Sequence, residues 1–505
     1  MITLNKALLK KTDLSKKLNL PQKDWDRLPE KVLQFGTGVL LRGLIDYYFD
    51  HANRNRVFNG RIVVVKTTKN GANNLFTDQN CLYTIHNKGI SEGVDVNEII
   101  LVSAISRVLN ATDQWDEVLQ VAISPDLKII VSNTTEIGIV MDNLVNLQVQ
   151  PPHSFPAKVL DVLYHRYLHY EGDMEMGLVI LPTELISENG KVLKDIILAS
   201  AKMLTLPSKF IHWIKEANDF CNTLVDRIVP GNLSTNEQLK AEKYLGFSDQ
   251  LSIMTDPFNL WAIESTSIRV KERLSIAKVN PGIIIAPDIW KFKELKLRLL
   301  NGSHTFSCAL AILADFGTVR QAMNNAVFST YVKTILIKEI VPTILNDQIT
   351  ETEAMTFAHQ VMNRFSNPFL DHRWMNISLN FTSKMQMRNV ALIQGYFEKH
   401  GSSPQYMALG FAAYITFMRS EKDEHGNFLG NTKRGCYFID DPKAAIFHDY
   451  WTKYSLKDIV IHVLKNQTLW QTNLNQIPGL ADQILYYLEL LNSKPVLEVI
   501  EELNN

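Results

Sequence analysis

The sequence predicts an α/β fold in which a mainly parallel β-sheet, covered by helices on both faces, is followed by a mainly α-helical domain. In the first part of the chain, short β-branched runs alternate with segments of helical periodicity, which is typical of parallel sheets with crossover helices. After Asp288 the hydrophobic pattern is almost entirely helical. We therefore place the domain boundary at residue 287, between residues 1–287 and residues 288–505.

Each expected element follows from a local pattern. Residues 31–35 (KVLQF) are an apolar run that stops at a glycine, so we expect a strand there and a helix over residues 40–52. Similar runs predict strands at residues 61–65, 127–132, 176–181 and 282–286, with residues 99–103 as a candidate third strand, and a helix at 208–221. In the second domain we expect helices at residues 291–316, 318–325, 328–345, 351–365, 406–419, 456–466 and 481–491, and a surface loop at residues 420–435.

The composition excludes several classes of function. Lysine and arginine total 52 against 53 acidic residues, so there is no broad basic field of the kind that binds nucleic acid. The four cysteines lie far apart, which offers neither a disulfide framework nor a zinc site. The first residues lack the apolar core of a signal peptide, and no apolar run approaches the roughly 18 residues that span a bilayer. We expect a cytoplasmic protein that binds neither nucleic acid nor membrane.

A glycine-containing turn follows the first expected strand. Gly36, Thr37 and Gly38 are succeeded by Val39 and Leu40 at the start of a helix, where backbone amides and the helix N-terminus suit a pyrophosphate. Leu41 replaces the third glycine of G-x-G-x-x-G, so the match to a Rossmann-type dinucleotide-binding domain is partial, and a purely structural turn is the alternative. The second strand ends at Lys66 with no acidic residue, which leaves NAD and NADP open.

A second constellation opens the helical domain. Lys296, Asn301 and His304 are spaced so that an α-helix would place them within an arc of roughly 140°. A desolvated lysine can transfer a proton to a ketone oxygen, and an asparagine amide can stabilise the alkoxide. The alternative is an amphipathic helix whose lysine is solvated.

The motif K-x4-N-x2-H resembles the catalytic motif of the long-chain mannitol dehydrogenase family, which consists of zinc-independent polyol dehydrogenases. Other segments agree in order, namely QFGTGVLLR, VSNTTE, FCNTLVDRIVPG, DPFNLWAIE and RFSNPFLDHRWMNISLNFTSK. The resemblance implies NAD as the cofactor and no metal. It also implies that Lys296 is the general acid and base, that Asn301 is an oxyanion donor, and that His304 positions the substrate or the lysine.

The same resemblance suggests binding residues. Gly36, Gly38, Asn133 and Thr135 fall where the family holds the dinucleotide. Asp226, with Arg227 beside it, and Lys384 fall where the family contacts substrate hydroxyls.

One departure from the family bears on the substrate. Mannitol-type members and one branch that acts on sugar acids carry an S-C-D-N stretch whose asparagine is a second oxyanion donor. Here the stretch reads Pro182-Thr183-Glu184-Leu185, which resembles another sugar-acid branch of the family. Glu184 then either binds a substrate hydroxyl or caps a local turn. A sugar acid also carries a carboxylate, and Arg388 is our candidate partner for it because a guanidinium binds carboxylates in a bidentate manner.

The remaining expectations concern partners and rival functions. His165 and His169 have the spacing of a helical metal pair, but no third ligand lies near them in the sequence, so we expect no metal. We expect a small-molecule sugar acid substrate and a monomer or small homo-oligomer. The rivals are another member of the family and, from a different class, a dinucleotide sensor without turnover.

Overall fold

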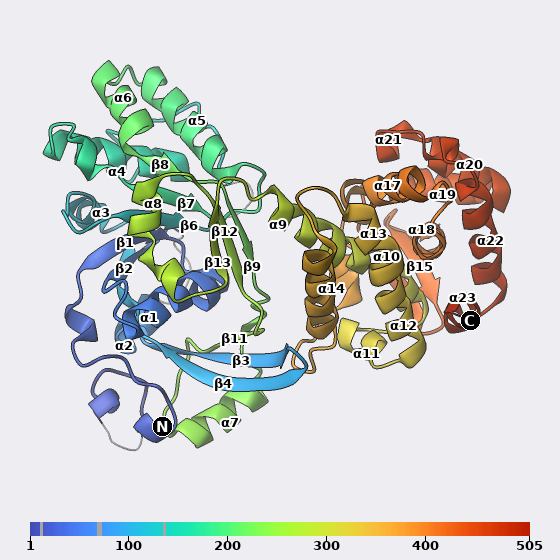
Figure 1. Cartoon of the computed structure of the whole chain (residues 1–505), viewed down its shortest axis with the longest axis horizontal. Helices are drawn as coiled ribbons and strands as arrows, with labels where there is room; N and C mark the ends of the chain where they lie inside the picture. The colour runs from blue at the N-terminus through green and yellow to red at the C-terminus, as the bar shows by residue number, and fades with distance from the viewer. Residues whose placement is uncertain (11–13, 68–72, 135–137, 505) are drawn as a thin grey trace. The chain divides into compact units, whose positions relative to one another are not determined.

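The computed structural model describes residues 1–10, 14–67, 73–134 and 138–504 (Figure 1). These residues form two compact units. Unit 1 comprises Met1–Lys88 and Asp95–Ile289, and unit 2 comprises Gly89–Val94 and Trp290–Asn505.

A six-stranded parallel sheet forms the centre of unit 1 (Figure 1). Its order is β5-β2-β1-β6-β7-β8, and the strands are β1 (Glu30–Phe35), β2 (Arg61–Lys66), β5 (Ile105–Asn110), β6 (Ile129–Ser132), β7 (Val179–Pro182) and β8 (Asp219–Phe220). The order reverses at β1, which has β2 on one side and β6 on the other. In open α/β sheets, ligands bind outside the carboxyl ends of the strands at such a point. The expected α/β fold with a Rossmann-type N-terminal domain is confirmed.

Both faces of this sheet are apolar, because successive side chains of a strand point to opposite faces. Val32 and Val64 belong to one core cluster, whereas Leu33 and Val65 belong to another. The first cluster includes residues of α1 (Asp46–Arg54). The second includes residues of α3 (Trp115–Ala122), α4 (Phe155–His169), α5 (Asn189–Met203) and α6 (Ser208–Ala217).

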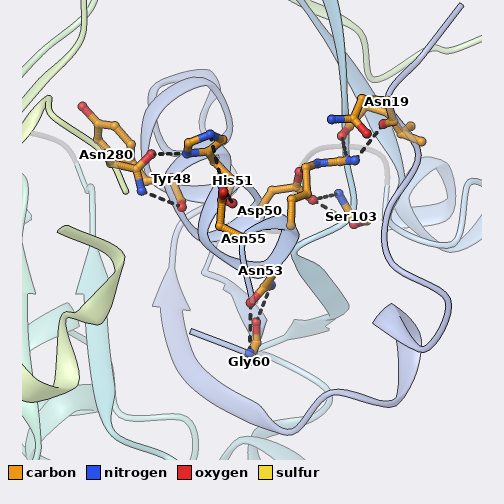
Figure 2. Close-up of polar contacts among 11 residues, drawn as sticks. Asn19, Tyr48, Asp50, His51, Asn53, Asn55, Gly60, Ser103 and Asn280 are labelled. Carbon is orange, nitrogen blue, oxygen red and sulfur yellow. Dashed lines mark hydrogen bonds and ion pairs between the residues drawn. The ribbon is translucent and has the colours of Figure 1, made fainter. Parts of the chain in front are cut away.

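Hydrogen bonds attach α1 to the segments that precede β5 and β2 (Figure 2). The Asp50 carboxylate accepts hydrogen bonds from the backbone N–H and the hydroxyl of Ser103 at 2.7 and 2.8 Å. Asn53 donates to the Gly60 carbonyl at 2.7 Å and accepts from its N–H at 3.0 Å. The helix that follows the glycine turn is therefore held by specific bonds as well as by apolar packing.

Two smaller sheets accompany the parallel sheet, and one of them corrects a prediction. The strand expected at residues 99–103 lies in β4 (Val94–Val102), which belongs to the sheet β10-β11-β3-β4, and β5 occupies the place beside β2. A β-branched run indicates a strand but not the sheet that it joins. The other strands of this sheet are β3 (Tyr83–Ser91), β10 (Gly231–Asn232) and β11 (Ile253–Thr255).

The third sheet of unit 1 contains the last strand that we predicted in the N-terminal domain. Residues 282–286 form β13 (Ile283–Ala286), which pairs in parallel with β12 (Leu260–Glu264). β12 also pairs antiparallel with β9 (Thr223–Asp226). The last residue of β9 is Asp226, one of the predicted substrate-binding residues.

Unit 2 is mainly helical, as expected. Its first helical run consists of α9 (Trp290–Glu294), a π-helical segment (Leu295–Gly302) and α10 (Ser303–Leu313). Further helices are α11 (Val319–Met323), α12 (Ala326–Thr334), α13 (Val341–Ile344), α14 (Glu351–Phe365), α15 (Trp374–Ile377), α16 (Phe381–Lys384), α17 (Ala391–His400), α18 (Gln405–Phe417), α19 (Ala444–Lys453), α20 (Leu456–Lys465), α21 (Gln467–Trp470), α22 (Leu480–Ser493) and α23 (Val496–Asn504). The buried helix α18 contacts both α10 and α22 and forms the centre of the unit.

Residues 420–435 are not the loop that we expected. They contribute to a three-stranded antiparallel sheet of β14 (Glu421–Lys422), β15 (Phe428–Thr432) and β16 (Gly435–Phe438). Charged, glycine-containing hairpins share their composition with loops, which explains the error. In the part of the chain that the structure describes, no helix has the length and apolar character needed to cross a membrane.

Candidate functional site

The turn after β1 needs glycine at its first position. Gly36 has a φ of +123°, and its N–H donates to the Val65 carbonyl at 3.0 Å. A Cβ at this position would lie 3.0 Å from both the Asn133 carbonyl oxygen and Leu41 Cδ1. The first glycine is therefore required by the protein's own backbone.

Gly38 differs from Gly36, because a Cβ built on it would meet nothing within 4 Å. Its carbonyl accepts the Arg42 N–H at 3.2 Å, in the first turn of the following helix. Among the residues that the structure describes, nothing requires glycine here, whereas a ligand that approaches the backbone would. Val39 and Leu40 pack instead against the core behind the turn.

A cavity of about 540 Å³ lies at the carboxyl ends of β1, β2 and β6. Its lining residues are Gly36, Thr37, Lys66, Thr67, Asn133, Thr134, Gly138, Val140, His153, Ser154, Phe155 and Lys158. Four predicted cofactor residues thus line one cavity: Gly36, Thr37, Lys66 and Asn133. Gly38, Val39 and Leu40 lie outside its lining, and Thr135 lies outside the described residues. The residues at the start of α4, including Lys158, were missed because a lysine in a helical pattern reads as solvated.

The loop after β6 is cross-linked to the end of β7. Asn133 Nδ2 donates to the carbonyl and the hydroxyl oxygen of Thr183 at 3.1 and 3.0 Å. Glu184 is buried, and its carboxylate accepts from the Ser132 hydroxyl at 3.1 Å and from the Thr134 N–H and hydroxyl at 2.9 and 3.0 Å. This geometry favours the alternative in which Glu184 caps a local turn.

The end of β9 carries two predicted substrate residues. Asp226 is buried there. The Arg227 guanidinium donates to the carbonyls of Asp256 and Gly43 at 3.0 and 2.5 Å, and it lies 4.9 Å from the centre of the Tyr47 ring. These contacts make Arg227 a structural cross-link of unit 1.

Lys296 and Asn301 lie on the π-helical segment of unit 2. In a π-helix residue i bonds to residue i+5, so these two residues are one π-turn apart and share a face more closely than in an α-helix. Both are half-buried, whereas Leu295 and Leu299 on the other faces are buried. The segment can thus present an amine and an amide to one reacting atom.

His304 lies in an aromatic pocket. Its ring stacks on Phe365 with 3.9 Å between centroids and meets His372 and Trp374 edge-on at 5.7 and 5.8 Å. Burial holds the pKa of His304 well below its usual value, and the neighbouring positive charges of His372 and Arg388 lower it further. His304 is therefore a neutral imidazole, and its buried Nε2 has no hydrogen-bond partner among the described residues.

Two predicted cations lie near this histidine. Lys384 donates to the Ile377 carbonyl at 2.8 Å, and Arg388 donates to the Thr305 hydroxyl at 3.1 Å. Burial lowers the pKa of both, and Arg388 lowers that of Lys384 further. Within the described ranges, neither side chain forms an ion pair with a carboxylate, so the pair can accept an external anion.

The histidine pair in α4 has other partners. His165 Nδ1 lies 3.1 Å from an Asp161 carboxylate oxygen, and His169 meets the Tyr170 ring edge-on. Over residues 1–10, 14–67, 73–134 and 138–504, no group of three or more His, Cys, Asp or Glu side chains could hold a metal ion.

Comparison with known proteins gives the same family for both parts of the chain. Residues 30–278 match the family described as "Mannitol dehydrogenase Rossmann domain", and residues 288–492 match "Mannitol dehydrogenase C-terminal domain". A relative from Halalkalibacterium halodurans, named altronate oxidoreductase, is 34% identical and covers 95% of this chain and 94% of its own. A second relative of that name, from Bacillus subtilis, is 33% identical over 95% of this chain and 96% of its own.

Two solved structures share the fold. One is Pseudomonas fluorescens mannitol 2-dehydrogenase in a ternary complex with NAD and D-mannitol, with a TM-score of 0.70, 22% identity and 99% of each chain covered. The other is a D-sorbitol dehydrogenase in substrate-free form, with a TM-score of 0.75, 21% identity, and 99% of this chain and 100% of that chain covered.

Proposed function

The chain belongs to the mannitol dehydrogenase family and is an oxidoreductase that acts on CH–OH groups, and from this premise we propose that it interconverts D-tagaturonate and D-altronate with NAD(H). The proposed substrate rests on the similarity, along almost the whole chain, to relatives named altronate oxidoreductase. The departure at Glu184 and Leu185 from the mannitol-type stretch supports the same branch. We further propose a cytoplasmic role in the breakdown of hexuronates.

The two parts of the chain have separate tasks in this proposal. Residues 1–287 hold the cofactor, and residues 288–505 bind the substrate and supply the proton.

The cavity of unit 1 fits a dinucleotide. The open space above Gly38 admits a ligand to the backbone, and the start of the following helix offers N–H donors to a phosphate. Gly36, Thr37, Lys66 and Asn133 would line the bound group. When bound, NADH supplies the hydride that reduces the ketone carbon.

Lys296 and Asn301 carry the proton chemistry on the ketone oxygen. In reduction, Lys296 gives a proton from its ammonium to this oxygen, and in oxidation the neutral amine takes the proton back. The Asn301 amide donates a hydrogen bond to the same oxygen and stabilises the negative charge that develops there. Their separation by one π-turn suits this shared task.

His304 is a positioning residue in this scheme. Its ring is held by Phe365, and it is neutral, so it adds no charge to the site. A neutral imidazole carries one N–H and one acceptor nitrogen, which can orient a substrate hydroxyl or the lysine.

The remaining binding residues match a polyhydroxy acid. Arg388 and Lys384 bind its carboxylate and a neighbouring hydroxyl, because both are cationic and neither is neutralised by a carboxylate of the described chain. Asp226 accepts from a substrate hydroxyl. The three hydrogen bonds that Glu184 accepts leave one of the roughly four acceptor positions of a carboxylate for a single substrate hydroxyl.

A substrate panel tests the proposal. NADH oxidation is followed by absorbance with tagaturonate, fructuronate and fructose, and NAD reduction is followed with altronate and mannitol. Turnover of tagaturonate and altronate well above the others supports the proposal. Preference for fructuronate would place the chain in another branch, and binding of NADH without turnover of any compound would favour a sensor.

A further inference from the structure

The cavity of unit 1 contains a buried lysine to which the sequence analysis assigned no role. Lys158 lies in the first turn of α4 and lines the cavity together with Lys66. Only 6% of its surface is exposed. Its Nζ donates to the carbonyls of Pro152 and His153 at 2.6 and 2.8 Å.

Over residues 1–10, 14–67, 73–134 and 138–504, no carboxylate compensates the charge of Lys158. An ammonium has three N–H donors, and two of them are used by these carbonyls. Among the described residues, the third has no acceptor and no carboxylate forms an ion pair with it. Burial lowers the pKa of Lys158 to about 8, so its ammonium is less stable relative to the neutral amine here than it is in water.

The position of Lys158 in the first turn of α4 further disfavours its positive charge. The first turn of a helix carries partial positive charge, and a cation there is disfavoured. α4 has Ser154 as its N-cap, and the Ser154 hydroxyl accepts the Ala157 N–H, so the cap itself is satisfied. A neutral amide could make the same bonds to the two carbonyls, so structure alone does not require a charged side chain at this position.

The lining of the cavity indicates what compensates the charge. Its described residues include two lysines and the backbone at the start of a helix, and none of them is an aspartate or glutamate. It also lies at the carboxyl ends of β1 and β6, where the sheet order reverses. An anion in this cavity would neutralise Lys158 and interact favourably with the helix N-terminus.

We infer that Lys158 is a cofactor-binding residue whose ammonium contacts a phosphate group of the dinucleotide. The inference rests on the proposed binding of NAD(H) and names a contact beyond the glycine turn. The expected loss on removing the charge is about ten- to a hundredfold in affinity, as for a hydrogen bond to a charged group.

The test compares dissociation constants of the full chain for NADH, ADP-ribose and adenosine, measured by fluorescence and calorimetry. Lys158→Gln keeps donors for the two carbonyls and removes the charge, while Lys158→Arg keeps the charge. Lys31→Gln is the matched control, because Lys31 is also partly buried, donates to a carbonyl (that of Phe58) and lies at the start of β1, at the opposite end of the strand from the cavity.

Lys158→Gln should weaken NADH and ADP-ribose about ten- to a hundredfold, leave adenosine unchanged, and leave the melting temperature of the free protein within a few degrees. Lys158→Arg should recover most of the affinity, and Lys31→Gln should bind as wild type does. Unchanged ADP-ribose binding in Lys158→Gln, or an equal loss for adenosine, would overturn the inference while the proposed function stands. If the wild type binds neither NADH nor ADP-ribose, the proposed function fails as well.

Discussion

Single alanine substitutions at Gly36 and Gly38 should have different effects. We expect the fold to require glycine at Gly36 and a bound ligand to require it at Gly38. Gly36 has a left-handed φ of +123°, and its missing side chain faces a backbone oxygen and a leucine methyl group at 3.0 Å. Gly38 lies outside the left-handed region and faces open space. We therefore expect the first substitution to destabilise the protein and the second to impair cofactor binding only.

The magnitudes follow from these geometries. Alanine at Gly36 adds backbone strain of about 1–3 kcal/mol. Relief of the two 3.0 Å contacts adds about 1–3 kcal/mol more. At roughly 1–2 °C per kcal/mol for a chain of this size, the melting temperature should fall by about 2–12 °C. Alanine at Gly38 should raise the unfolding free energy by about 0.4–1 kcal/mol, because it restricts the unfolded chain.

Thermal unfolding of the free protein and NADH titration measure the two effects. Gly36→Ala should melt well below wild type. Gly38→Ala should melt at or slightly above the wild-type temperature and yet bind NADH at least tenfold more weakly. A Gly38→Ala protein that binds NADH as wild type does would refute the ligand role, and equal destabilisation by both substitutions would refute the geometric distinction.

Three further predictions concern charge. Arg388→Met should raise the KM for the sugar acid at least tenfold, with little effect on the NADH dissociation constant or on reduction of fructose, which has no carboxylate; an unchanged KM would remove Arg388 from the site. Because the pKa of Lys158 is about 8 and only the ammonium form attracts an anion, the wild-type affinity for ADP-ribose should fall as pH rises above about 8. The fall should be absent in Lys158→Gln, and its persistence there would contradict this assignment to Lys158. The Glu339 carboxylate accepts the Tyr406 and Met407 N–H groups at the start of α18, both at 2.8 Å. Glu339→Ala should therefore lower the unfolding free energy by about 1–3 kcal/mol without a change in NADH binding. An unchanged thermal transition would contradict this.

The parallel sheet was predictable because its strands are short, buried and rich in β-branched residues. Residues 31–35, 61–65 and 127–132 lie in β1, β2 and β6 at the centre of the sheet. β5 was missed because Arg107 interrupts its apolar pattern. The sheet at residues 421–438 was missed because its strands are short and incompletely buried and are joined by charged turns. Such elements depend on their pairing partners more than on their own composition.

Only those residues of the candidate site that belong to a recognisable sequence motif could be predicted from the sequence. The glycine turn and the lysine–asparagine pair stand out in the sequence, but the π-helical geometry of Leu295–Gly302 does not, because α- and π-helices share composition. The hydrogen bonds of Glu184 come from residues about 50 positions away in the sequence. Arg227 likewise reads as a site residue in the sequence, while the structure engages it with Gly43 and Asp256.

The central claim is that Lys296 supplies the proton for reduction of a sugar acid ketone. The most direct measurement is single-turnover reduction of tagaturonate by NADH, with wild type beside Lys296→Ala and with the NADH dissociation constant measured for both. We predict that the variant binds NADH as wild type does and reduces tagaturonate at least a hundredfold more slowly. A variant that reduces tagaturonate at the wild-type rate would contradict the assignment of Lys296.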